Sequence, residues 1–179
     1  MLSNLKYKLL LKQFKNKVYN YSIYMLRNRM DADDVTQEVL IKLWKNINNF
    51  NINAASSYIM KITHNLCIDY LRRRNILLKR ELEIDDIFEE TYTNINDLNN
   101  PELMISRENL SLRLKDAIEN LPLNLKSIFV MYQLHGMKYK EISEALDLPL
   151  NSVKVYLMRA RIKLQKELKL LKDEIAIPN

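Results

Sequence analysis

Residues 139–164 read YKEISEALDLPLNSVKVYLMRARIKL and contain two short helical patterns separated by a turn. Apolar residues in the second pattern recur at helical spacing and form one stripe that suits packing on a core. This stripe consists of Val153, Leu157, Ala160, Leu164, Leu168 and Leu171. The first pattern would bury Ile142 and Leu146, and Asp147 stands at the turn, where a short polar side chain tolerates a left-handed backbone. The spacing predicts a helix-turn-helix, the unit whose second helix enters the major groove of DNA.

The opposite side of the second pattern is expected to face solvent. It presents Val155, Met158, Arg159 and Ile162, with Lys154 and Arg161 on one flank and Tyr156 and Lys163 on the other. Asn151 or Ser152 is expected to cap this helix by accepting a hydrogen bond from a free backbone N–H. An ordinary pair of amphipathic helices with solvated cations has the same pattern, so this segment alone leaves both interpretations open.

The composition favours an all-helical protein. The chain has 179 residues, of which 47% are hydrophobic, enough to bury a core. One Gly and four Pro leave little material for hairpins or phosphate-binding loops. Cys67 is the single cysteine, which excludes an intramolecular disulfide. No apolar run approaches the roughly 20 residues of a membrane span, and no signal peptide is visible. We therefore expect a cytoplasmic protein without membrane insertion.

The charges divide the chain into basic and acidic blocks. Residues 1–30 have seven Lys/Arg and no acid, whereas residues 81–109 have one Arg and nine acids. Residues 75–99 also lack sustained periodicity, and such a long connector is improbable within one compact domain. We predict two small helical domains, at 1–75 and 101–179, joined by an acidic linker at 76–100. Helices are expected at 4–28, 33–48, 55–74, 101–119, 123–135, 138–146 and 151–172, with the Asn100-Pro101-Glu102 sequence as a clear helix start.

Residues 31–44, DADDVTQEVLIKLW, contain a second signal. As a helix, this segment and its continuation would bury Val39, Leu40, Leu43 and Ile47, and would expose Asp34, Gln37, Glu38, Ile41 and Lys45. An exposed Ile among acids and an amide favours a protein-binding surface over an enzyme pocket. Acids in a first helical turn also complement the helix dipole, and this simpler explanation remains open.

Residues 50–74 combine an apolar stripe with a mixed outer face. The stripe is Ile59, Ile62, Leu66 and Tyr70; the outer face is Tyr58, Lys61, Asn65, Ile68 and Arg72. An aromatic ring for stacking, an amide for base edges and cations for phosphates suit the capture of single-stranded DNA. The Arg72-Arg73-Arg74 run alone could equally complement the helix dipole.

Taken together and in order, these motifs resemble bacterial sigma factors of the extracytoplasmic-function (ECF, group IV) class. The resemblance covers nearly the whole chain. It rests on DADDVTQE at 31–38, the helix containing Ile62, Asn65, Asp69, Leu71, Arg72 and Arg73, the N-P-E at 100–102, the L-P at 121–122 and the helix-turn-helix with R-A-R at 159–161. Such an ordered set is specific, although each motif alone is not.

The resemblance implies an alternative sigma factor that recognises minus-10 and minus-35 promoter elements. Binding to core RNA polymerase would use Asp34, Gln37, Glu38 and Ile41. The minus-10 strand would contact Phe50, Asn53, Ser56, Tyr58, Lys61, Asn65, Arg72 and Arg73. The minus-35 duplex would contact Ser152, Lys154, Val155, Met158, Arg159 and Arg161. Promoter DNA and core RNA polymerase are thus the implied partners, with an anti-sigma factor as a further candidate.

The chain departs from the family pattern at three places, and one of them is the turn before the second helix, where Asn151-Ser152-Val153 stands in place of the common Gly-Thr-Val. Tyr58 stands where many relatives have Trp, which keeps a stacking plane but a smaller one. Val155-Tyr156 stands where a Ser-Arg pair is common, which puts one phosphate contact in doubt. The change suggests a more apolar minus-35 contact, toward thymine methyl groups.

No enzymatic arrangement competes with this interpretation. His64, Cys67 and His135 are too few for a zinc site, and no cofactor is implied. Cys67 lies beside the buried stripe, where a core cysteine is the commoner case. Two alternatives remain: a stand-alone helix-turn-helix regulator, and a protein-interaction adaptor that mimics a sigma factor. The basic second helix argues against the adaptor, and the 31–38 motif has no evident role in the regulator.

Overall fold

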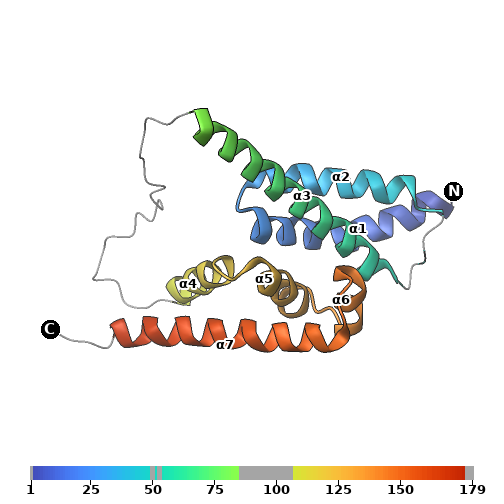
Figure 1. Cartoon of the computed structure of the whole chain (residues 1–179). Helices are drawn as coiled ribbons and strands as arrows, with labels where there is room; N and C mark the ends of the chain where they lie inside the picture. Colours follow the sequence, from blue (N-terminus) through green and yellow to red (C-terminus); the bar gives the residue numbers. More distant parts are fainter. Residues whose placement is uncertain (1, 49–50, 52–53, 85–106, 176–179) are drawn as a thin grey trace.

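The computed structural model describes residues 2–48, 51, 54–84 and 107–175, and in these ranges the regular structure is helical (Figure 1). The helices are α1 (Leu2–Leu26), α2 (Arg29–Lys45), α3 (Ala55–Ile84), α4 (Arg107–Glu119), α5 (Leu123–Phe129), the π-helical turn η2 (Val130–Leu134), α6 (Tyr139–Leu146) and α7 (Leu150–Ile175). The expected all-α fold is confirmed.

Helices α1, α2 and α3 pack together into the N-terminal module (Figure 1). Its core contains Val18, Tyr21, Val35, Leu43 and Ile59, each at most 1% exposed. These side chains recur on one face of each helix, so three amphipathic stripes meet in one core.

Helix α2 begins at Arg29, earlier than the predicted start at residue 33. The Asn28 side chain caps it by accepting a hydrogen bond from the N–H of Asp31 at 3.1 Å. Arg27, with φ 54°, supplies the sharp turn between α1 and α2. An Asn cap followed by an acid in the first turn stabilises the positive end of a helix, which explains the early start.

Helix α3 extends beyond its predicted end at residue 74 and reaches Ile84. Part of the expected linker is therefore helical, and the prediction that the segment from 75 onward lacks regular structure is wrong as far as residue 84. The remainder of the linker and the predicted helix start at 100–102 lie outside the described residues, as do Phe50 and Asn53.

The helix-turn-helix forms as predicted from α6 and α7. Ile142 is fully buried, and Asp147 ends α6 in the left-handed conformation, with φ 52° and ψ 43°. Helix α7 begins at Leu150, and the Pro149 carbonyl accepts a hydrogen bond from the N–H of Val153 at 3.2 Å. Asn151 and Ser152 therefore lie inside the first turn, and the prediction that one of them is the N-cap is wrong.

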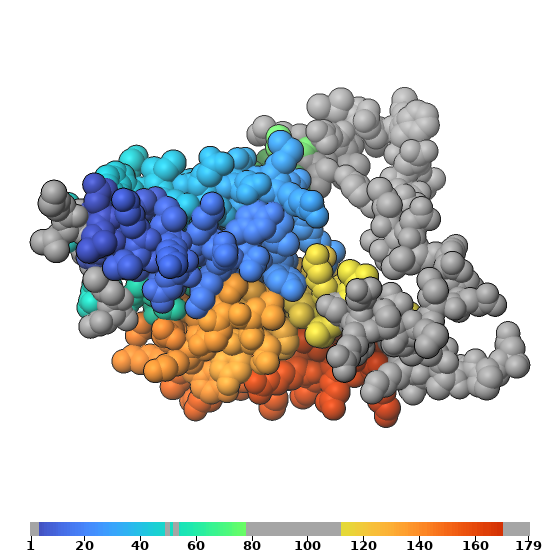
Figure 2. All heavy atoms as spheres, turned by 180° about the vertical axis from the view of Figure 1, so that it is seen from behind, coloured from blue at the N-terminus to red at the C-terminus, as the bar shows by residue number. Residues whose placement is uncertain are grey.

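The two modules pack directly on each other. Helix α3 lies against α6, and α1 contacts α4, α5 and η2. Figure 2 shows the blue residues of α1 resting on orange residues of the C-terminal module. The arrangement brings the N-terminal part of α3 into contact with the helix-turn-helix, through side chains that are 86 and 87 residues apart in sequence.

Candidate nucleic-acid and protein interfaces

The exposed face of α7 agrees with its sequence pattern. Val153, Leu157 and Ala160 are at most 1% exposed and hold the helix against the core. On the other side Val155 is 40% exposed and Met158 is 54% exposed, as expected for a face turned away from the protein. This outer face is available to a partner along the N-terminal half of the helix. The remaining members of the predicted minus-35 set are exposed or partly exposed: Ser152, Lys154, Arg159 and Arg161.

Arg161 is turned toward the flank of α7 that faces η2. Its guanidinium carbon lies 5.3 Å from the centre of the Tyr132 ring, and Tyr132 stacks on Tyr139 with ring centres 5.0 Å apart. The cation is attracted to the negative face of the ring. Arg161 is therefore held at the edge of the outer face, away from its centre, which suits a contact with the DNA backbone better than one with a base.

Helix α2 exposes the predicted protein-binding residues on one face. Asp34 and Gln37 are exposed, and Ile41 is 53% exposed. Glu38 is partly exposed and pairs with Lys42 at 3.0 Å, one helical turn away. A single exposed apolar side chain is common on protein surfaces, so an interaction surface requires further apolar side chains on the same face.

Two more apolar residues on this face were missed from the sequence. Met30 is 77% exposed and Trp44 is 44% exposed, and both lie at helical spacing from Ile41. The Trp44 ring meets Tyr7 of α1 edge to face, with ring centres 5.0 Å apart. The spacing from Ile41 to Trp44 was the signal that could have identified this larger apolar stripe.

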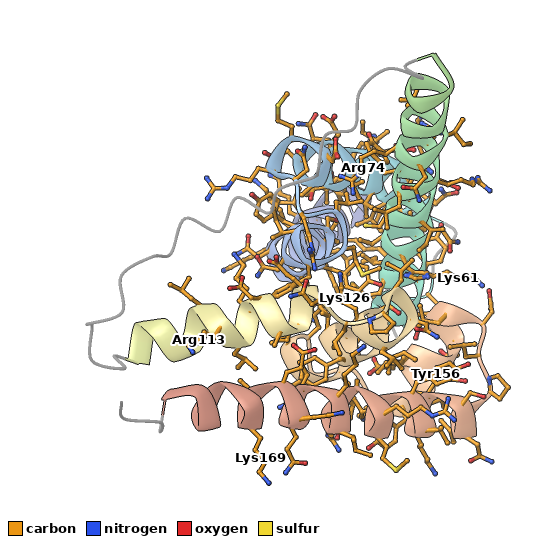
Figure 3. All side chains as sticks on the ribbon, turned by 60° about the vertical axis from the view of Figure 1, so that its left-hand side comes forward. Lys61, Arg74, Arg113, Lys126, Tyr156 and Lys169 are labelled. Atoms are coloured by element: carbon orange, nitrogen blue, oxygen red, sulfur yellow. The ribbon has the colours of Figure 1, made fainter. Side chains whose placement is uncertain are left out.

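The outer face of α3 is less open than the sequence predicted, because α6 covers part of it. The hydroxyl of Ser57 donates a hydrogen bond to a carboxylate oxygen of Glu144 at 2.9 Å. The Lys61 ammonium pairs with Asp147, with N–O distances of 2.6 and 2.8 Å. Figure 3 shows Lys61 where α3 meets the C-terminal module. Tyr58 is partly buried against the core.

The other described residues of the predicted minus-10 set remain exposed or partly exposed to solvent. Asn65, Arg72 and Arg73 are exposed, and Arg72 pairs with Asp69 at 2.6 Å. Ser56 is partly exposed. The structure therefore splits this set into an open part along the middle of α3 and a part that the C-terminal module contacts.

A buried polar cluster lies between the modules. The Tyr21 hydroxyl of α1 is hydrogen-bonded to Nδ1 of His64 in α3 at 2.8 Å, and the His135 ring centre lies 6.2 Å from the Tyr21 ring centre. Burial lowers the pKa of His64 to about 4. Burial, and next the positive charge of Lys17, lower the pKa of His135 to about 4. Both histidines are therefore neutral at pH 7 and fill the contact between the modules without adding charge.

The single cysteine of the chain, Cys67, is buried. Burial raises the pKa of the Cys67 thiol to about 12, so it is not a thiolate at neutral pH. In the described part of the chain, no group of three or more His, Cys, Asp or Glu residues could hold a metal ion. Among the same residues, no helix has the length and apolar character required to span a lipid bilayer.

Comparison with protein families defines the class of protein. Residues 10–76 match the model described as sigma-70 region 2, and residues 111–164 match the model described as sigma-70, region 4. The first match covers most of the N-terminal module, with the exposed face of α2. The second covers the helix-turn-helix. The chain thus contains the two regions of a sigma-70-type transcription factor.

Individual relatives narrow the family. The chain is 30% identical over 159 residues to the ECF RNA polymerase sigma factor SigW of Bacillus subtilis, covering 87% of this chain and 85% of SigW. It is also 30% identical over 169 residues to the ECF RNA polymerase sigma-E factor of Haemophilus influenzae, covering 90% and 87%. A match to the ECF sigma factor SigE of Mycolicibacterium smegmatis, at 27% identity, covers 59% of that longer protein. The chain belongs to the ECF RNA polymerase sigma factor family.

Solved structures show the same fold. The sigma factor RpoE of Bartonella quintana, solved in complex with the anti-sigma factor NepR, matches with a TM-score of 0.66 at 20% identity, covering 90% of this chain and 96% of RpoE. CnrH, solved in complex with the cytosolic domain of CnrY, matches with a TM-score of 0.63 at 18% identity, covering 92% and 88%.

Proposed function

We propose that this chain is an alternative sigma factor that binds core RNA polymerase in the cytoplasm and directs it to promoters with minus-10 and minus-35 elements. The observation that supports this most strongly is the presence, in one ECF family member, of an exposed face on α2 that mixes apolar and polar side chains and an exposed face on α7 that is flanked by cations. Neither a stand-alone regulator nor an adaptor needs both.

The polymerase-binding surface is assigned to α2. Asp34, Gln37 and Glu38 would supply polar contacts, and the stripe of Met30, Ile41 and Trp44 would be buried by the polymerase. Covering large apolar side chains is favourable at roughly 25 cal/mol per Å² of apolar surface. The apolar stripe would therefore provide affinity, and the polar residues would fix the register of the two proteins.

Promoter contacts are assigned to the two modules separately. The predicted domain at residues 1–75 would hold the minus-10 strand through the α3 set, and the predicted domain at residues 101–179 would hold the minus-35 duplex through α7. Opening about ten base pairs costs roughly 14 kcal/mol at about 1.4 kcal/mol per step. Trapping an unstacked base returns only about 1–3 kcal/mol. The chain alone therefore cannot open a promoter, and the polymerase must contribute.

Run-off transcription tests the proposal. Purified chain is added to core RNA polymerase with a library of promoter fragments from its own genome, and transcripts are compared with those of core alone. We expect discrete new start sites. If core with the chain gives no transcript beyond core alone, the proposal is wrong. A chain that binds promoter duplexes tightly without polymerase would instead be the stand-alone regulator.

The α2 assignment has its own test. We expect the double variant Gln37→Ala/Glu38→Ala to bind core polymerase more weakly, with an unchanged melting temperature, because both side chains are at the surface. Asp116→Asn, an exposed acid on α4, is the matched control. Equal affinity of both variants in a pull-down would contradict the assignment.

An anti-sigma factor is a further proposed partner. RpoE of Bartonella quintana was solved in complex with an anti-sigma factor, and its chain has the same fold as this one. The product of a neighbouring reading frame with a single membrane span is the first candidate to test. Its cytosolic part should bind the chain and should also stop run-off transcription. If it fails in either assay, that candidate is excluded.

A further inference from the structure

The outer face of α7, which is proposed to contact DNA, presents two apolar side chains beside its cations. Val155 and Met158 stand near its centre, 40% and 54% exposed, and neither side chain can donate or accept an ordinary hydrogen bond. In the major groove, hydrogen-bonding side chains distinguish purine edges and cytosine, whereas apolar side chains find a matching group in the C5 methyl of thymine. The chemistry of this face therefore points to thymine.

The positions of the two side chains suit contact with neighbouring base pairs. Both lie in the first ten residues of α7, which begins at Leu150, and the N-terminal part of a recognition helix is the part that contacts base edges. Three residues advance about 4.5 Å along a helix and return to nearly the same side. Base pairs are about 3.4 Å apart, so Val155 and Met158 can reach adjacent or next-adjacent pairs.

The charges around the face indicate that its partner is DNA. Residues 148–166 contain five Lys/Arg and no Asp or Glu. Lys154 and Arg159 are exposed beside Val155 and Met158, where they can hold phosphates on either side of the groove. A protein partner that covered the apolar pair would have to accommodate this row of cations, whereas a DNA duplex pairs with it.

We propose that Val155 and Met158 determine the minus-35 preference of this chain by contacting thymine methyl groups on neighbouring base pairs. The inference rests on the proposed function, since it names what the α7 face contacts. Lys154 and Arg159 then supply affinity and register, while the two apolar side chains select the bases.

The experiment begins with selection of the DNA probe. The full chain, bound to core polymerase, is used to enrich duplexes from a pool randomised across the minus-35 region. We expect enrichment of sequences with thymines at two positions no more than two base-pair steps apart. In the enriched duplex each thymine is then replaced singly by deoxyuridine, which removes the C5 methyl and leaves the hydrogen-bonding edge intact.

The expected effect follows from burial of a methyl group. Replacement of a contacted thymine by deoxyuridine should weaken binding about three- to fourfold, the factor for one buried methyl group. In the Val155→Ala variant, the deoxyuridine effect should disappear at the thymine that Val155 contacts and remain at the other thymine. In the Met158→Ala variant, the two thymines should exchange these roles. Lys154→Gln is the comparison variant: it should weaken binding to all sequences and reduce the salt dependence, with the deoxyuridine effects intact.

Three outcomes would overturn the inference while leaving the proposed function standing. These are an enriched element without the thymine pair, equal binding of thymine and deoxyuridine duplexes, and a deoxyuridine effect that survives both Ala variants. Since deoxyuridine changes only the DNA, the second result does not depend on any variant folding. If the pool shows no enrichment and core polymerase gains no promoter-dependent transcription, the proposed function itself fails.

Discussion

The contacts between α3 and α6 give the most direct prediction, because strand binding and module packing compete for Lys61. Lys61, a member of the predicted minus-10 set, is paired with Asp147, and the nearby Ser57 is bonded to Glu144, so Lys61 cannot contact a DNA strand while the modules are packed. We expect Glu144→Gln/Asp147→Asn to loosen the packing of the modules and to increase affinity for single-stranded minus-10 DNA. Asn is chosen because it tolerates the left-handed conformation at residue 147.

The size of the effect follows from the two contacts. The Lys61 and Asp147 side chains are 39% and 73% exposed, so their pair contributes between about 0 and 1 kcal/mol. The Glu144→Gln change would keep a neutral hydrogen bond with Ser57, and a neutral bond is about half as strong as a charged one, so roughly 1 kcal/mol is lost there. Together, about 1–2 kcal/mol corresponds to a five- to thirtyfold shift toward separated modules. Strand affinity rises by up to the same factor if the packed state predominates.

Fluorescence anisotropy with a labelled non-template oligonucleotide measures this affinity. The double variant Asp116→Asn/Glu167→Gln is the matched control, because it removes two acids that take no part in the described contacts between the modules. It corrects for the general gain in DNA affinity that follows from losing negative charge. If both double variants gain affinity equally, or if neither does, the competition between strand binding and packing is refuted.

Two further predictions concern buried titratable side chains near the contact between the two modules. The pKa values of His64 and His135 are lowered to about 4 in the folded chain, whereas an unfolded histidine has a pKa near 6.5. As the pH falls below about 6.5, the unfolded chain therefore binds protons before the folded chain does. The free energy of unfolding is highest above about pH 6.5 and decreases toward pH 4 by roughly 3 kcal/mol per histidine. Urea unfolding at pH 7 and pH 4.5 measures this decrease in the free energy of unfolding. In His135→Gln the decrease should be about half as large. An unchanged decrease would contradict the lowered pKa of His135. Burial, and next the charge of Arg27, lower the pKa of Lys126 to about 8. Lys126→Met should therefore raise the melting temperature, and a lower one would show that the ammonium makes a favourable contact.

The sequence predicted α7 well because only one of its faces is buried. Val153 and Leu157 recur at helical spacing and lie in the core, so the positions between them had to be the outer face. The same reasoning found Ile41 on α2. It does not identify Trp44, because a large aromatic side chain at the end of a helical pattern is as compatible with a buried position as with an exposed one.

The sequence was a poorer guide to α3, which is buried on two sides. Periodicity identified the stripe with Ile59 that packs on α1, but the contact with α6 is made by Ser57 and Lys61, polar residues that resemble a solvent-facing surface. A contact between modules through hydrogen bonds and an ion pair leaves no hydrophobic pattern. Its detection requires the relative position of two segments far apart in the chain, which local patterns do not contain.

The buried cluster around Tyr21 has a practical consequence for spectroscopy. The chain has two histidines, and both lie beside the same tyrosine, one from each module. Their imidazole proton resonances can be assigned with single substitutions, and both are sensitive to the ring current of Tyr21. In a solution of the chain with polymerase or promoter DNA, the His135 signal should shift if the C-terminal module leaves Tyr21, whereas the His64 ring stays beside Tyr21 within the N-terminal module and serves as the reference.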